Sequence, residues 1–167
     1  MKDLTIRIIQ PPKLSKEQKT KISKDSVHKR IGLTQKQYLD NNVIKENEKE
    51  FVEQFTELGY KIKWITKRKK NLKTGQILPN NDFVWNEIEW ECKSISNPKY
   101  SSISRRLRIP TLQGKKNIFL DMRDKTLSVK LYKQLASFNV RKRKRRIERL
   151  VIWDKKGVKE IDLLEEK

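Results

Sequence analysis

Three residues near the middle of the chain have the types and spacing that phosphodiester chemistry uses. Asp82 opens this segment, and Glu91 and Lys93 close it with only Cys92 between them. Alternate residues of an extended strand point to the same face, so we expect Glu91 and Lys93 to lie side by side. Carboxylates are the ligands that Mg²⁺ prefers, and a lysine can stabilise developing negative charge. The segment therefore predicts metal-dependent phosphodiester cleavage, on condition that Asp82 lies beside Glu91.

A further candidate comes from the predicted helix that precedes this segment. Ile44, Phe51 and Phe55 recur at helical spacing, and Glu48 falls on the same face. A carboxylate that points from this helix towards the sheet would complete a site of three carboxylates and a lysine. The ion we expect there is Mg²⁺ (or Mn²⁺), with Asp82, Glu91, Glu48 and the backbone carbonyl of Cys92 as ligands.

The same residues also have ordinary structural explanations. Asp82 could cap a turn, and Glu91 could pair with Lys93 on a solvated strand face. Glu48 could stand near the helix start because the helix dipole favours an acid there. An acid and a lysine separated by one residue are common, so spacing alone leaves both interpretations open.

The charge of the chain predicts a polyanionic partner. The 167 residues include 41 lysines and arginines against 21 acids, which gives a net charge of +20. A charge of this size indicates nucleic acid or a membrane surface rather than a particular fold. The expected nucleic-acid contacts lie in basic clusters and comprise Lys67, Arg68, Lys69, Lys70, Arg105, Arg106, Arg108, Gln113, Lys115, Lys116, Arg141, Arg143 and Arg145.

Composition disfavours several other classes of protein. No apolar stretch is long enough for a transmembrane helix, and no signal peptide is visible at the N-terminus. Cys92 is the lone cysteine, which excludes an internal disulfide, and His28 is the lone histidine, which disfavours a metal-free histidine RNase. We expect a cytoplasmic site of action for a chain that could be delivered as the C-terminal part of a larger secreted protein.

Hydrophobic periodicity predicts an α/β protein with a central mixed sheet flanked by helices. Residues 1–43 are expected to form a basic, partly helical extension, and residues 44–167 the α/β domain. The expected helices cover 16–30, a short segment after Thr34, 44–58 with Leu58 on its apolar face and Gly59 at its end, a helix-like stretch over 101–113, and 127–139. Ser15 with Gln18 and Thr34 with Gln37 predict capping boxes at the first two helix starts. An apolar stripe predicts the last helix and comprises Leu127, Leu131, Leu135 and Phe138. The expected strands cover 4–9, 60–65, a hairpin of 83–85 and 88–95, 117–121, 150–153 and 158–161.

This order of elements resembles the PD-(D/E)xK nuclease superfamily, in which a helix bearing an acid precedes strands bearing Asp and Glu-x-Lys. A closer likeness is to the C-terminal tRNase domains of contact-dependent inhibition toxins, and related domains occur at the ends of some phage head proteins. The likeness covers about residues 44 to 162 and rests on 82–93, 101–106, 112–116, 118–121, 127–128 and the last two strands.

The resemblance implies a metal-dependent RNase that acts on tRNA and is neutralised in its own cell by an immunity protein. It implies that Glu48, Asp82, Glu91 and Lys93 hold the acidic and lysine positions of the family. It also implies that Gln113, with Lys115 or Lys116, matches the basic stretch beyond the second helix. A surface of +20 favours an acidic inhibitor, because opposite charges steer and complement an interface.

Two departures from the family pattern carry expectations of their own. Pro110 is expected to perturb the helix over 101–113. A two-residue turn with positive φ prefers Asn-Gly, so we expect a wider hairpin around Asn86 and Glu87. Two other functions remain open: a DNA endonuclease of a mobile element or phage, and a basic nucleic-acid-binding module without catalysis.

Overall fold

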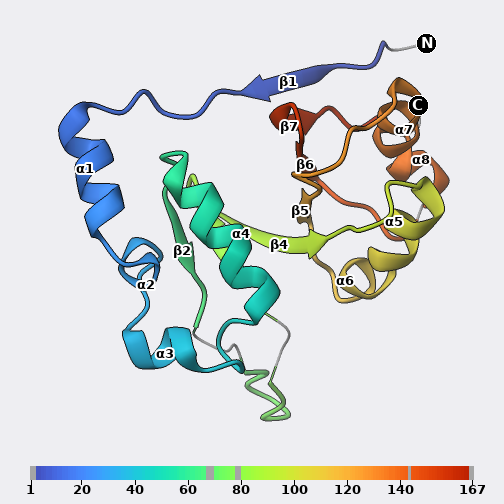
Figure 1. The fold of residues 1–167 in the computed structure, drawn as a ribbon. Coiled ribbons are helices and arrows are strands. Elements are labelled where there is room, and N and C mark those ends of the chain that lie inside the picture. Colours follow the sequence, from blue (N-terminus) through green and yellow to red (C-terminus); the bar gives the residue numbers. More distant parts are fainter. Residues whose placement is uncertain (1–2, 67–69, 78–79, 143, 166–167) are drawn as a thin grey trace. The chain divides into compact units, whose positions relative to one another are not determined.

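The computed structural model describes residues 3–66, 70–77, 80–142 and 144–165. These residues form an α/β protein with a seven-stranded mixed sheet and eight helices (Figure 1). The chain divides into two compact units, one of residues 1–10 and 90–167 and one of residues 11–89. The expected fold class is confirmed at this level. The expected boundary between residues 43 and 44 stays a prediction.

The strands follow the order β1-β7-β6-β5-β4-β3-β2 in the sheet. β4 pairs in parallel with β5, and β5 in parallel with β6, whereas the β1–β7, β6–β7 and β2–β3 pairs are antiparallel. The strands are β1 (Ile6–Ile9), β2 (Ile62–Trp64), β3 (Phe83–Trp85), β4 (Ile88–Ser94), β5 (Asn117–Asp121), β6 (Arg149–Asp154) and β7 (Gly157–Ile161). All of the expected strands are present among the described residues.

The helices are shorter than the periodicity predicted. They are α1 (Lys16–Lys24), α2 (Val27–Arg30), α3 (Gln35–Leu39), α4 (Glu46–Glu57), α5 (Tyr100–Arg106), α6 (Arg108–Leu112), α7 (Val129–Ala136) and α8 (Phe138–Arg141). The predictions of single helices over 16–30 and 127–139 were wrong, because each of these stretches forms two helices. The stretch over 101–113, where a helix perturbed in its later half was expected, forms α5 and α6 with the division at Leu107.

Arg30 gives the physical reason for the first break. Its guanidinium donates to the carbonyl oxygens of Ile22 at 2.9 Å and Asp25 at 3.1 Å, and its Nε donates to Thr56 Oγ1 at 2.9 Å. These bonds satisfy carbonyl groups at the end of α1 and hold α2 against α4. The expected N-terminal capping boxes of α1 and α3, at Ser15 and Thr34, are both confirmed.

Aromatic rings form the core of the unit of residues 11–89. Phe51 and Phe55 on α4 stack with ring centroids 5.3 Å apart, and they contact Phe83 and Trp85 on β3. Leu58 was expected on this apolar face, and that prediction was wrong because it is the exposed C-cap of α4. Gly59 ends the helix with a φ of 97°, as expected.

The β3–β4 hairpin closes with a two-residue turn. Asn86 and Glu87 adopt φ values of 52° and 64°, which are left-handed at both positions. The prediction of a wider hairpin was therefore wrong. Asn tolerates this conformation better than most residues, and a turn of this kind matches the twist of paired strands. The turn fixes the start of β4, which continues into the unit that carries Glu91.

Helices α5, α7 and α8 pack on one face of the sheet in the unit of residues 90–167 (Figure 1). Ile118 and Leu120 of β5, with Leu150 and Ile152 of β6, supply the strand side of this core. The helical side includes Ile103, Leu131, Leu135 and Phe138. The stripe that predicted the helix near residue 131 is therefore the buried face.

Candidate nuclease site

Glu91 and Lys93 form an ion pair on β4. Lys93 Nζ lies 3.0 Å from Glu91 Oε1, so the expected proximity of the two side chains is observed. Strand alternation produces it, because Trp90 and Cys92 point to the opposite face. The pair is not on a solvated face, since Glu91 is only 6% exposed. The structure therefore departs from the solvated alternative weighed from the sequence.

The register between β4 and β5 explains the burial of Glu91. Glu91 is opposite Ile118, and Lys93 is opposite Leu120. Opposed residues of paired strands share a face, so both charged side chains lie on the face where Ile118 and Leu120 contact the helical core. Burial in this position removes the carboxylate from water.

Lys115 completes this cluster. Its Nζ lies 3.2 Å from Glu91 Oε2, and the residue is 5% exposed. We expected Lys115 on the basic nucleic-acid surface together with Lys116, and it is Lys116 that is exposed. The cluster of Glu91, Lys93 and Lys115 lies entirely within the unit of residues 90–167.

The end of α6 positions Lys115. Gly114 adopts a φ of 79°, and its amide donates to the Thr111 carbonyl at 3.1 Å. The Lys115 amide donates to the Pro110 carbonyl at 3.0 Å, which completes a Schellman motif. Pro110 itself lies in the first turn of α6, where a helix needs no amide donor. Gly114 marks the end of the helix in the sequence, but no local signal distinguishes the buried Lys115 from the exposed Lys116.

The contact between Lys115 and Glu91 is an ion pair without a hydrogen bond. Glu91 Oε2 and Lys115 Nζ are both buried, and neither has a hydrogen-bond partner among the described residues. Buried charges normally acquire hydrogen bonds as well as opposite charges, because desolvation is costly. This oxygen and this ammonium are consequently the two atoms of the cluster with unused bonding capacity.

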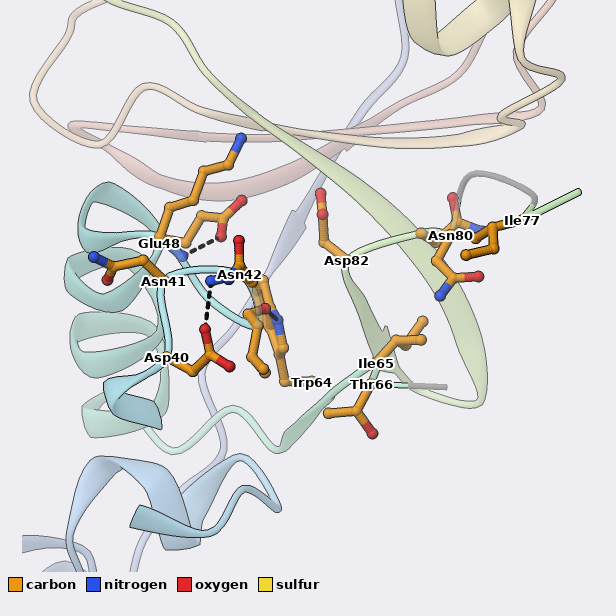
Figure 2. Close-up of a pocket in the computed structure, with 13 residues that line it drawn as sticks. Asp40, Asn41, Asn42, Glu48, Trp64, Ile65, Thr66, Ile77, Asn80 and Asp82 are labelled. Carbon is orange, nitrogen blue, oxygen red and sulfur yellow. Dashed lines mark hydrogen bonds between the residues drawn. The ribbon is translucent and has the colours of Figure 1, made fainter. Parts of the chain in front are cut away.

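The other two predicted ligands lie together in the unit of residues 11–89. Glu48 on α4 and Asp82 just before β3 both line a pocket of about 550 Å³ (Figure 2). Trp64 forms part of the wall, where its Nε1 donates to the Val43 carbonyl at 2.9 Å. The pocket also contains Asp40, Asn42, Asn80 and Asn81. The structure thus brings Glu48 and Asp82 to one polar cavity.

Glu48 also has a structural role at the start of α4. Its Oε2 accepts a hydrogen bond from the Lys45 amide at 2.8 Å (Figure 2), which satisfies a donor that the helix leaves free. The Asp82 backbone carbonyl accepts from the Ile65 amide at 2.9 Å, which ties the start of β3 to the end of β2. Both residues are therefore held in place by backbone bonds beside the pocket.

The predicted metal ligands fall into two groups. Glu48 and Asp82 belong to residues 11–89, whereas Glu91 and the half-buried Cys92 belong to residues 90–167. Within either described part, no group of three or more His, Cys, Asp and Glu side chains could hold a metal ion. The oxygen donors fit a hard cation, and Glu91 Oε2 is a buried acceptor without a hydrogen bond. The proximity of Asp82 and Glu91 stays a prediction.

Most of the described residues predicted to contact nucleic acid are exposed. Exposed positions are Lys70, Arg105, Arg106, Arg108, Gln113, Lys116 and Arg141, and Arg145 is half-buried. The Arg141 guanidinium lies 5.1 Å from the ring centroid of Tyr100, which connects α8 to α5 through a cation–π contact. Lys67, Arg68, Lys69 and Arg143 lie outside the described residues.

Comparison with known proteins adds no family or relative. No family model, curated protein or solved structure matches the chain. None of the helices in the described ranges is both long and apolar enough to cross a membrane.

Proposed function

We propose that this protein is a metal-dependent nuclease of the PD-(D/E)xK type. The observation that carries the proposal is the buried cluster of Glu91, Lys93 and Lys115, where a carboxylate and two ammonium groups meet beside a pair of parallel strands. A buried charged cluster costs free energy, and in this one Glu91 Oε2 and Lys115 Nζ also lack hydrogen bonds among the described residues, so we explain its presence by chemistry rather than by stability.

The order of the elements supports the same proposal. Helix α4, strands β2, β3 and β4, then α5 with α6, and then β5 follow one another along the chain. The nuclease superfamily that the sequence resembles has a helix, a strand meander, a helix and a further strand in the same order. Glu48, Asp82 and the pair of Glu91 and Lys93 fall on or beside the corresponding elements.

Each proposed site residue has a role that its chemistry permits. Glu91, Asp82, Glu48 and the Cys92 carbonyl would hold Mg²⁺ or Mn²⁺. A bound divalent ion supplies charge neutralisation on the phosphate and a water of lowered pKa. Lys93, which is more exposed than Glu91, would orient a water or stabilise negative charge on the phosphate. Burial of Glu91 excludes bulk water from this carboxylate and so strengthens its charge interactions.

We propose tRNA as the substrate and a toxin as the biological class. The net charge of +20 and the exposed arginines of α5 and α6 support a nucleic-acid partner. The likeness to tRNase domains favours RNA over DNA. An acidic immunity protein would then cover the site in the producing cell, and the toxin would act in the cytoplasm of a target cell.

Cleavage assays with purified protein test this proposal. The protein is incubated with Mg²⁺ and either total tRNA or plasmid DNA, with EDTA in parallel samples. We expect Mg²⁺-dependent cleavage of tRNA, and a loss of roughly 10²-fold or more in Glu91→Gln and Lys93→Ala. Lys99→Ala, which changes a lysine just before α5 and outside the cluster, is the matched control and should retain activity. Cleavage of plasmid alone would replace the tRNase by a DNA endonuclease.

One observation favours a second candidate, a nucleic-acid-binding module without catalysis. Two ammonium groups already neutralise Glu91. For such a module, Glu91→Gln and Lys93→Ala would bind RNA like the parent, and no sample would show Mg²⁺-dependent cleavage. The same set of variants therefore separates the two candidates.

A further inference from the structure

The two oxygens of the Glu91 carboxylate are in contact with two different lysines. Lys93 Nζ lies 3.0 Å from Oε1, and Lys115 Nζ lies 3.2 Å from Oε2. One negative charge therefore faces two positive charges, and the cluster carries an excess positive charge. The two lysines differ in their access to water, since the side chain of Lys93 is 27% exposed and that of Lys115 is 5% exposed.

This difference gives the two lysines different freedom. The partly exposed Lys93 side chain can turn its ammonium towards solvent. Lys115 has no such route in the observed structure, because the Schellman motif holds its backbone and its ammonium is buried. The next residue is also fixed, because the Lys116 carbonyl accepts from the Glu148 amide at 2.7 Å. The backbone bonds around Lys115 therefore keep its ammonium beside Glu91.

A divalent cation and the Lys115 ammonium need the same carboxylate. A cation bound through Glu91 would place two positive charges within a few ångströms of an ammonium that water does not screen. The Glu91 Oε2 atom lacks a hydrogen bond among the described residues, and the Lys115 ammonium lies against it. Binding of a cation at this oxygen therefore requires the Lys115 contact to break.

We propose that Lys115 is an internal counter-ion of Glu91 that competes with a divalent cation for the carboxylate. This inference rests on the proposed nuclease function, and it assigns Lys115 a regulatory effect on metal affinity. Lys115 neutralises Glu91 and opposes the binding of a cation to that carboxylate, so the metal affinity of the protein is lower than it would be without this lysine. Lys115 acts through Glu91 and is a positioning residue rather than a catalytic one.

Metal-binding calorimetry with Mn²⁺ tests the competition directly. Lys115→Met replaces the ammonium by an apolar group of similar length, and we expect the Kd for Mn²⁺ to fall about tenfold or more. Lys116→Met, which changes the exposed neighbour, should bind Mn²⁺ like the parent. Lys115→Arg retains the charge and should also keep the parental affinity. Glu91→Gln defines the heat that arises from other sites.

A second measurement keeps the test independent of activity and folding. Circular dichroism establishes that each variant is folded, and the rise in Tm with Mn²⁺ reports binding to the native state. We expect a larger rise for Lys115→Met than for the parent. If Lys115→Met is folded and binds Mn²⁺ no more tightly than the parent, the competition is disproved.

The outcomes also separate this inference from the proposed function. Mg²⁺-dependent cleavage by the parent, with unchanged Mn²⁺ affinity in Lys115→Met, would overturn the counter-ion role alone. Absence of Mn²⁺ binding at Glu91 in the parent and in Lys115→Met would overturn the metal site and the counter-ion role together. Tighter binding in Lys115→Met, with parental affinity in Lys115→Arg and Lys116→Met, supports both.

Discussion

Asn139 and Ile147 exchange two hydrogen bonds across the base of a basic loop. Asn139 Nδ2 donates to the Ile147 carbonyl at 2.8 Å, and the Ile147 amide donates to Asn139 Oδ1 at 2.9 Å. Both residues are buried. The loop between them joins α8 to β6 and includes Lys142, Lys144, Arg145 and Arg146. A neutral amide thus closes a loop whose own charges repel one another.

Asn139→Ala should destabilise the protein by about 2–4 kcal/mol, because it leaves a buried amide and a buried carbonyl of Ile147 without partners. Urea unfolding followed by circular dichroism measures the change. Asn97→Ala, at an exposed position before α5, is the control and should change stability by less than about 0.5 kcal/mol. Equal stability of the two variants would show that water replaces the side chain of Asn139.

A second buried network, made of Asp154, Lys159 and Tyr132, predicts an asymmetric response to mutation. Lys159 Nζ lies 2.9 Å from both carboxylate oxygens of Asp154, and the Tyr132 hydroxyl donates to the same carboxylate. Burial, together with this hydrogen bond, raises the pKa of Tyr132, so the phenol remains a neutral donor. The network therefore contains one buried ion pair and one neutral partner.

Asp154→Ala should cost about 3–5 kcal/mol, because it leaves the Lys159 ammonium buried without an opposite charge. The double variant Asp154→Leu with Lys159→Met should be more stable than Asp154→Ala, since it removes both charges. Thermal and urea unfolding of the two variants give the comparison. A double variant less stable than Asp154→Ala would contradict this account. It would mean that other contacts of the network, such as the Tyr132 hydrogen bond to Asp154, stabilise the protein more than the ion pair does.

The ion pair of Arg149 and Glu160 predicts how the unfolding free energy of the protein depends on pH. Arg149 donates to both carboxylate oxygens of Glu160, at 2.7 and 2.9 Å, and these bonds lower the pKa of Glu160 although burial opposes them. A lowered pKa in the folded state means that the stabilisation is present above the ordinary glutamate pKa of about 4.3. It is lost as the pH falls from there through the folded pKa.

The protein loses unfolding free energy as the pH falls from neutral to acid, and this loss should be smaller in Glu160→Gln. Urea unfolding at several pH values below about 5 measures this slope for the parent and the variant. Glu148→Gln, at an exposed position before β6, is the control and should retain the parental slope. Parallel slopes for the parent and Glu160→Gln would show that Arg149 does not stabilise the charged form.

Local patterns in the sequence were sufficient for the strands and for part of the site. Alternation along β4 placed Glu91 beside Lys93, and the capping residues Ser15 and Thr34 marked helix starts correctly. These features depend on neighbours along the chain, where spacing determines which side chains meet. The exposed position of Leu58, by contrast, shows that periodicity did not locate the end of the buried face of α4, because Leu58 is the C-cap.

The features that the sequence did not predict depend on contacts between distant parts of the chain. At the break between α1 and α2, Arg30 bonds to the carbonyls of Ile22 and Asp25 and also to the distant Thr56, and no local pattern contains this last contact. Lys115 was expected at the surface because a lysine beside another lysine usually faces solvent. Its burial requires the end of α6 to meet β4, which pairing of β4 with β5 brings about.

The exposed arginines of α5 and α6 predict the salt dependence of nucleic-acid binding. Replacing Arg105, Arg106 and Arg108 by glutamine should weaken tRNA binding and make the plot of log K against log salt less steep, by up to about one unit for each phosphate that an arginine no longer neutralises. Fluorescence anisotropy with labelled tRNA, repeated over a range of salt concentrations, gives the slope. Lys155→Gln with Lys156→Gln, in the exposed turn between β6 and β7, removes charge elsewhere in the same unit and should leave the slope nearly unchanged. If both sets of variants lower the slope equally, binding follows net charge alone and α5 with α6 is not a specific contact surface.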